Sequence, residues 1–207
     1  MPSVPGLDGR TSLEQWLNER SSGLKITAVH RLDMDTSGVL VFAKNPQAES
    51  NLKTQFENRT VSKTYMARLC AKDCGNPIPT KGTIELPLSP DYDERPRQKV
   101  DFKQGKAAKT EYELVNENPD GTTDILFHPV TGRTHQLRVH SAHHLGLGRP
   151  IIGDLLYGGW SIDQTIQYKK ELQTPRLHLH SFCISFYHPS TGEPLTFSSA
   201  EPWHTTP

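Results

Sequence analysis

The chain has 207 residues, a formal net charge of zero at pH 7, and apolar and charged fractions of 34% and 22%. This length is typical of one domain with a sizeable core, and the composition argues against disorder. No run approaches the roughly 20 apolar residues that span a membrane, and residues 1–20 lack the apolar region of a signal peptide. We therefore expect a cytoplasmic protein with no membrane association.

Three helices are predicted from capping signals and apolar spacing. The first covers residues 12–20 with Ser12 as its N-cap, the second follows Asn45 with Pro46 in its first turn, and the third covers residues 134–145. The apolar residues on one face of the first helix are Leu13, Trp16 and Leu17. The residues expected on the buried face of the second helix are Ala48, Leu52 and Phe56.

Runs typical of strands separate and follow these helices. They cover residues 26–29, 39–43, 63–69, 82–86, 99–102, 110–115, 123–127, 178–186 and 195–198. Short strands joined mostly by tight turns, with few helices, predict an α+β fold with a largely antiparallel sheet. No internal repeat or domain linker is visible, so one domain over residues 1–207 is the simplest interpretation.

One polar loop is the most informative part of the chain. Asp33 precedes turn-forming residues 36–38 and the apolar run 39–42. A carboxylate in a loop on a rigid scaffold is well placed for chemistry. The alternative is that Asp33 is only a turn former that accepts local backbone hydrogen bonds.

Several segments resemble motifs of the RluA family of pseudouridine synthases, and they occur in the family's order. The strings are HRLDMDTSGVLVFAK at 30–44, KTYMAR at 63–68, RPRQKV at 95–100 with GKAAKTEY at 105–112, VTGRTHQLRVH at 130–140, GRPIIGD at 148–154 with YG at 157–158, and RLHLHS at 176–181. The third of these is most similar to the small members of the family, which lack a separate RNA-binding domain. The resemblance covers most of the chain.

The resemblance implies a bent mixed sheet with a central catalytic cleft, and an isomerase that detaches uracil from its ribose and rejoins it through carbon. Asp33 would act as a nucleophile toward the sugar or as a base that removes a sugar proton, and the sequence leaves both open. Arg133 would pair with Asp33 and keep it ionised. Read without the family, Arg133 is a surface residue at the start of a helix.

The resemblance also supplies residues that bind the substrate. The target uridine must leave the RNA stack, and Tyr65 is the expected aromatic platform for it, although a tyrosine on a strand is more often core. Arg31 would enter the duplex where the base has left, and Leu179 would pack the pocket near the base. His30 and His180 are interpreted as structural. The reaction needs no cofactor.

The expected partner is RNA. The small family members imply a uridine in a hairpin loop of large-subunit ribosomal RNA and one in the anticodon stem-loop of certain transfer RNAs. Because the net charge is zero, phosphate binding would depend on a local basic stretch, whose cations are Arg95, Arg97, Lys99, Lys103, Lys106 and Lys109. The alternative for this stretch is a solvated hairpin face. With no obvious coiled coil, a monomer is the default.

Two other functions compete with the isomerase. One is an RNA-binding module without activity, because the chain begins within a family turn at residues 3–6 and we expect it to lack an N-terminal hairpin. The other is a metal-dependent hydrolase, which would take its ligands from His135, His140, His143, His144, His178 and His180. We expect no metal site, and we expect Cys70, Cys74 and Cys183 to be reduced thiols.

Overall fold

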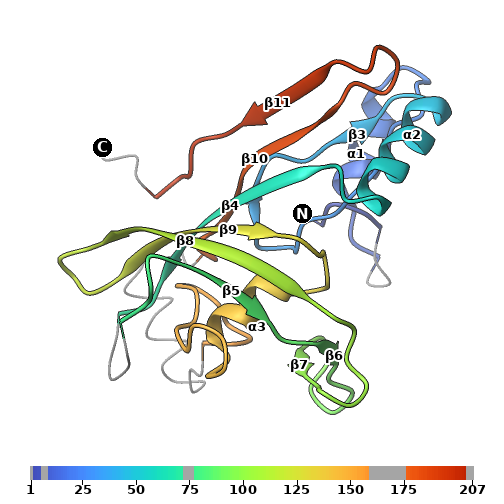
Figure 1. Ribbon diagram of the computed structural model, residues 1–207. Coiled ribbons are helices and arrows are strands. Elements are labelled where there is room, and N and C mark those ends of the chain that lie inside the picture. The colour runs from blue at the N-terminus through green and yellow to red at the C-terminus, as the bar shows by residue number, and fades with distance from the viewer. Residues whose placement is uncertain (1, 6–8, 72–76, 159–175, 204–207) are drawn as a thin grey trace. The chain divides into compact units, whose positions relative to one another are not determined.

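The computed structural model describes residues 2–5, 9–71, 77–158 and 176–203 (Figure 1). Contacts divide the chain into two compact units. The first unit comprises Met1–Lys63 and Ser181–Thr205, and the second comprises Thr64–His180 with the last two residues. Two strands, β4 (Ser62–Leu69) and β10 (Leu179–Tyr187), contribute residues to both units. Each unit is described by itself.

The first unit contains two helices and short strands, and β1 pairs with β3 and β10 with β11, both antiparallel. The elements are α1 (Leu13–Arg20), β1 (Thr27–Ala28), β2 (Ser37–Gly38), β3 (Phe42–Ala43), α2 (Pro46–Glu57) and β11 (Pro194–Ser198). Its core is a cluster of buried apolar side chains that includes Ala48 and Leu52 of α2, with Phe56 packed at its edge.

Both helix starts in the first unit are confirmed. Ser12 accepts a hydrogen bond from the Gln15 backbone N–H at 3.1 Å, and the Ser12 backbone N–H donates to the Gln15 side chain at 2.8 Å, which completes a capping box. Asn45 accepts from the Ala48 N–H at 2.8 Å, and Pro46 occupies the first turn. Both signals lie within four residues of the helix end that they specify, so the sequence alone reveals them.

The predicted strand at residues 39–43 is wrong in its extent, because only Phe42 and Ala43 form a strand. The N–H of Val41 donates to the side chain of His30 at 2.9 Å instead of to a neighbouring strand. Residues 36–38, predicted as a turn, include the short strand β2, which pairs with β10. Gly38 permits this approach, since a Cβ there would lie 2.3 Å from the carbonyl oxygen of Ser181, and its φ is +110°.

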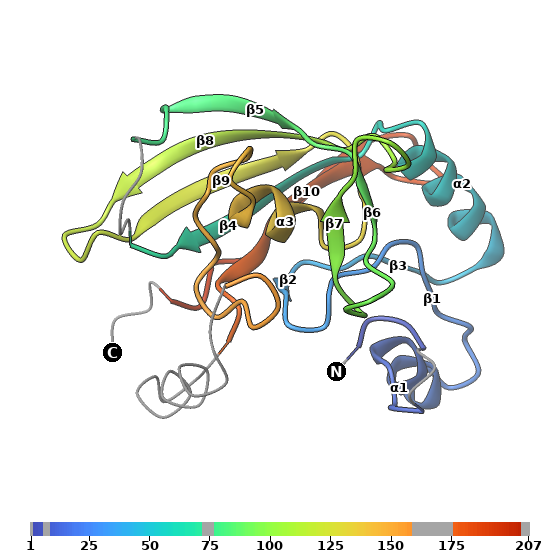
Figure 2. The same ribbon diagram turned by 90° about the horizontal axis from the view of Figure 1, so that it is seen from below.

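The second unit is built on the strand order β4-β9-β8-β5, with every register antiparallel. Helix α3 lies against one face of this sheet (Figure 2), and β6 and β7 form a separate hairpin. The remaining elements are β5 (Lys81–Glu85), β6 (Leu88–Pro90), β7 (Gln98–Val100), β8 (Lys109–Glu117), β9 (Thr123–Pro129) and α3 (Gln136–Ala142). The α+β class and the largely antiparallel sheet are confirmed.

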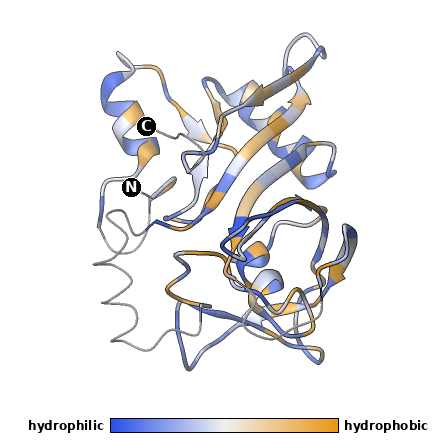
Figure 3. Ribbon diagram, turned by 90° about the vertical axis from the view of Figure 1, so that its left-hand side faces the viewer, coloured by the Kyte–Doolittle hydropathy of each residue, from blue (hydrophilic) through white to orange (hydrophobic). Residues whose placement is uncertain are grey.

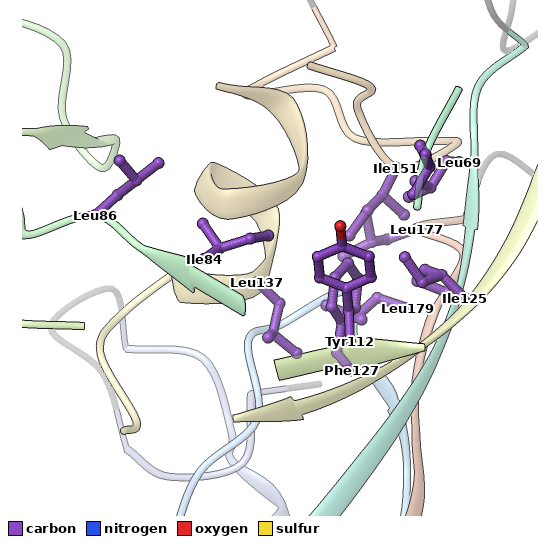
Figure 4. Close-up of a cluster of buried hydrophobic side chains, with 12 residues drawn as sticks. Leu69, Ile84, Leu86, Tyr112, Ile125, Phe127, Leu137, Ile151, Leu177 and Leu179 are labelled. Atoms are coloured by element: carbon purple, nitrogen blue, oxygen red, sulfur yellow. The ribbon is translucent and has the colours of Figure 1, made fainter. Parts of the chain in front are cut away.

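The core of the second unit joins the sheet to α3. Twelve buried residues form it, including Leu69, Ile125 and Phe127 from the strands and Leu137 from α3 (Figure 4). Figure 3 shows hydrophobic and hydrophilic residues along the same strands, as expected where side chains point alternately to two faces. No helix in the described part of the chain is long and apolar enough to cross a membrane.

The largest boundary difference from the prediction in the second unit is at α3, and one short strand there is missing from the prediction. Helix α3 covers residues 136–142 rather than 134–145. It starts late because His135 has a left-handed backbone, with φ at 53° and ψ at 18°, which cannot belong to the helix. The short strand β6 was not predicted, because its three residues, with a proline at the end, give too weak a pattern.

Candidate active site

The loop that carries Asp33 is fixed on both sides within the first unit. Leu32 is buried, and both of its peptide groups are hydrogen-bonded. The carbonyl oxygen of Asp33 accepts a hydrogen bond from the N–H of Thr36 at 3.0 Å, which closes a turn. Beyond the turn, the N–H of Val39 donates to the carbonyl oxygen of Ser181 at 2.9 Å. The side chain of Asp33 is half-buried, whereas Arg31 is exposed.

The ring of His30 is bound to the segment that follows the loop, and it is neutral at pH 7. Its Nε2 accepts the hydrogen bond from Val41, so the proton of the neutral imidazole is on Nδ1. The ring also stacks on Phe56 with centroids 4.9 Å apart. Burial, with the nearby charge of Lys63, lowers the pKa of His30 from 6.5 to about 4. These contacts fit the interpretation that His30 orients the loop.

This pKa predicts a loss of stability in mild acid. The unfolded chain takes up a proton on His30 near pH 6.5, whereas the folded chain does so only near pH 4. The free energy of unfolding is therefore unaffected by the protonation of His30 above pH 6.5. It falls as the pH drops from 6.5 towards 4, by about 1–2 kcal/mol at pH 5. We expect His30→Gln, which keeps an acceptor for Val41, to lose less unfolding free energy between pH 7 and pH 5 than the natural chain. Urea unfolding at the two pH values measures this, and equal losses would contradict it.

The backbone that carries Arg133 is fixed by one buried side chain, Gln136. Its Oε1 accepts from the N–H of Arg133 at 2.9 Å and from the hydroxyl of Thr131 at 2.8 Å. Its Nε2 donates to the carbonyl oxygen of Lys109 and to the hydroxyl of Thr110, both at 2.9 Å. Gln136 thus makes four hydrogen bonds that join the loop before α3 to strand β8.

The guanidinium of Arg133 is bound through its Nε within the described part of the chain. Its Nε donates to the carbonyl oxygen of Ala107 at 3.1 Å, and the residue is exposed. Among the residues that the structure describes, Nη1 and Nη2 of Arg133 have no hydrogen-bond partner. A guanidinium held by Nε presents its other edge, which suits a carboxylate or a phosphate.

A second network includes the same loop, and of its members only His135 has a role suggested by the sequence, as a candidate metal ligand. The hydroxyl of Tyr157 accepts from the N–H of Gln98 in β7 at 2.7 Å and lies 2.8 Å from Nδ1 of His135. The phenol carries one proton and can donate it to Nδ1 of His135 in the tautomer whose proton is on Nε2. Burial raises the pKa of Tyr157 to about 12, so it keeps this proton at neutral pH.

A buried ion pair supports this network. Arg138 donates to both carboxylate oxygens of Asp154, from Nε at 2.8 Å and from Nη2 at 2.7 Å. Oδ1 of Asp154 also accepts from the backbone N–H groups of Leu156 and Tyr157. These residues lie within the matching motifs, but only a structure reveals which partner each one binds.

The remaining predicted site residues lie on strands. Tyr65 is half-buried in β4, opposite Phe127 of β9, and packs against the core of the second unit. Leu179 belongs to that same core and is almost fully buried. Of the five predicted residues, the structure brings Tyr65 and Leu179 to one cluster, with Arg133 in the same unit. Asp33 and Arg31 belong to the first unit, so the pairing of Asp33 with Arg133 stays a prediction.

One of the candidate metal ligands, His140, has hydrogen-bond partners at both ring nitrogens. His140 is buried, with Nδ1 at 2.9 Å from the hydroxyl of Thr110 and Nε2 at 3.1 Å from the carbonyl oxygen of Leu86. Cys70 and Cys183 are free thiols, and Cys74 lies outside the described residues. Within the described ranges, no group of three or more His, Cys, Asp or Glu side chains could hold a metal ion.

Comparison with known proteins agrees with the motifs. A family model described as RNA pseudouridylate synthase matches residues 6–143. The dual-specificity RNA pseudouridine synthase RluA of Escherichia coli K12 is 43% identical over 172 residues, which are 83% of this chain and 72% of that protein. Human RNA pseudouridylate synthase domain containing 1 has a similar structure, with a TM-score of 0.72 at 28% identity over 92% of this chain and 74% of its own.

A further human structure, RNA pseudouridylate synthase domain containing 4, shares the fold, with a TM-score of 0.70 at 23% identity over 97% of this chain and 82% of its own. The chain therefore belongs to the RNA pseudouridylate synthase family, in its RluA branch. It is an isomerase that acts on RNA.

Proposed function

We propose that the chain converts particular uridines to pseudouridine in stem-loops of large-subunit ribosomal RNA, of the transfer RNA anticodon arm, or of both. The bond between N1 of uracil and C1′ of ribose breaks, a bond between C5 and C1′ forms, and the proton of C5 is lost while N1 gains one. Since the product has the same atoms and the same oxidation state as the substrate, the reaction needs no redox carrier. The observation that carries the proposal is the motif around Asp33, within the matched family region.

In this proposal Asp33 is the nucleophile or base, and Arg133 is its cationic partner. The bound Nε of Arg133 and the unpartnered Nη edge within the described residues support the second role. Arg31 occupies the place that the base leaves, and Leu179 packs near the base. The proposed catalytic domain comprises residues 1–207, and the enzyme acts as a cytoplasmic monomer.

Side chains in and next to the β6–β7 hairpin support the proposal that the chain binds RNA. Arg95 lies over the ring of Tyr92, with its Cζ 5.2 Å from the centroid. Tyr92 and Phe102 are each 68% exposed. Arg97 and Lys99 are paired with acids of the same segment, which limits their attraction for phosphate. Exposed aromatic rings beside cations are typical of surfaces on which unpaired bases stack.

The test is tritium release from RNA hairpins that carry 5-tritiated uridine. We expect release by the natural chain in the presence of a chelator, since the exchange of C5 for N1 at C1′ frees the label, and no release by Asp33→Asn. Release that stops on addition of chelator would instead favour a metal-dependent reaction. Hairpin binding without release by the natural chain would favour an inactive RNA-binding module.

The role of Tyr65 gives a separate prediction. Tyr65→Phe keeps an aromatic face and should still bind and stack the extruded base, with reduced turnover. Tyr65→Ala should lose a further 1–3 kcal/mol, about 5- to 150-fold in the rate constant divided by the dissociation constant, because stacking on an aromatic ring is of that size. Single-turnover tritium release over a range of enzyme concentrations measures both. Equal activity in all three proteins would refute the stacking role.

A further inference from the structure

Ser3 contacts the loop of Asp33 although it lies 29 residues earlier in the chain. Its side-chain oxygen is 3.2 Å from the carbonyl oxygen of Leu32 and 3.2 Å from the backbone nitrogen of Leu32. The hydroxyl can donate to the first and accept from the second. Ser3 and Leu32 are only 8% and 9% exposed, so no abundant water competes for these groups.

Ser3 is itself held against helix α1. Its carbonyl oxygen accepts from the N–H of Glu14 at 3.2 Å, and that of Pro2 accepts from the N–H of Leu13 at 2.8 Å. These are two of the four N–H groups that the start of a helix leaves without an internal partner. Hydrogen bonds therefore connect α1 to the residue that precedes Asp33, and Ser3 is the link.

The other end of this connection is also fixed. The carboxylate of Glu14 accepts from the N–H of Ala28 in β1 at 2.7 Å. The side chain of Asn18 binds both the N–H and the carbonyl oxygen of Ile26, at 2.8 and 2.7 Å. Helix α1 is thus bound to the strand that leads into the loop. Through Ser3 it is also bound to the loop itself, at Leu32.

We propose that Ser3 is a positioning residue for the reaction: its hydroxyl fixes both main-chain groups of Leu32 and thereby the direction of the Asp33 carboxylate. The proposal rests on the proposed catalytic role of Asp33. Displacements of about 1 Å in a reacting group can cost 100-fold in rate. Without the hydroxyl, the N–H and carbonyl groups of Leu32 are buried and unsatisfied, and the backbone shifts to recover partners.

The matched control is Ser141, a buried serine of α3 in the second unit. Its hydroxyl donates to the carbonyl oxygen of Arg149 at 2.6 Å. Ser3→Ala and Ser141→Ala each remove one buried hydroxyl, so a loss of activity that follows from lower stability alone would appear in both. Ser3→Cys, which keeps the size of the side chain but bonds weakly, replaces Ser3→Ala if the latter does not fold. Ser3→Thr restores a hydroxyl.

The measurements are the single-turnover rate constant at saturating RNA hairpin, the dissociation constant of that hairpin, and the thermal midpoint. We expect Ser3→Ala and Ser3→Cys to lower the rate constant at least tenfold, with hairpin affinity within twofold, and Ser3→Thr to recover most of the rate. Ser141→Ala should keep the rate within twofold at a lower midpoint. An unchanged rate in Ser3→Ala, or an equal loss in Ser141→Ala, would overturn the proposal.

The failure of the underlying function gives a different result. If Asp33→Asn still releases tritium, Asp33 is not the catalytic group, whatever the behaviour of Ser3. If Asp33→Asn is inactive and Ser3→Ala is fully active, only the positioning role is wrong.

Discussion

Asp33→Asn is expected to lower the rate of pseudouridine formation by at least 10²–10⁴-fold, the range usual for the loss of one group that transfers a proton, and by more if Asp33 is a nucleophile. Asparagine has almost the same shape, so the loop and its contacts with Thr36 should persist. It has no negative charge, and its amide neither attacks a sugar carbon nor removes a proton at a useful rate. Single-turnover tritium release at saturating hairpin measures the rate, and a filter-binding titration should give a dissociation constant within twofold.

The loop offers its own control for this experiment. Asp35 lies two residues further along, and it is exposed. Asp35→Asn also removes one negative charge from this loop. Weaker repulsion between the loop and the RNA phosphates would therefore affect both variants equally. We expect Asp35→Asn to keep the rate within twofold. More than a tenth of the natural activity in Asp33→Asn would remove Asp33 from its role.

The local parts of the fold could be predicted from the sequence because their causes are local. Ser12 with Gln15, and Asn45 with Pro46, specify helix starts through bonds that span at most three residues. Runs such as residues 63–69 and 123–127 are long enough for β-branched and aromatic residues to reveal a strand. The motif around Asp33 is equally continuous, which is why the candidate residue could be named before its surroundings were known.

The errors arise where a distant group competes with local pattern. The apolar residues after Gly38 have strand propensity, but the N–H of Val41 binds the ring of His30 and the strand is reduced to two residues. Helix α3 starts late because His135 adopts a left-handed backbone while its ring binds Tyr157, 22 residues later. The contact of Ser3 with Leu32 spans 29 residues. Periodicity and capping signals describe residues a few positions apart, so contacts over these sequence separations are found only in the folded structure.

Breaking the buried ion pair should have the largest effect on stability. In Arg138→Met the carboxylate of Asp154 keeps its two backbone donors but loses its cation, in a site where the two side chains are 5% and 0% exposed. Removal of one partner of a buried pair typically costs about 3–5 kcal/mol, because the remaining charge is desolvated and uncompensated. Urea unfolding measures the loss. Lys53→Met is the control, since Lys53 forms an exposed pair with Glu49 at 2.6 Å and such pairs contribute about 0–1 kcal/mol.

A double variant identifies the cause of that loss. Asp154→Asn removes the charge but keeps an oxygen that can accept from the N–H groups of Leu156 and Tyr157. If the unpaired carboxylate is the main cost, Arg138→Met with Asp154→Asn should be more stable than Arg138→Met alone, although it carries a second substitution. If the double variant is instead less stable by the sum of both single losses, the pair contributes through packing around Tyr157 and not through charge. In that case the loop that holds Arg133 depends on the shape of this core, because Tyr157 contacts both His135 and Gln98.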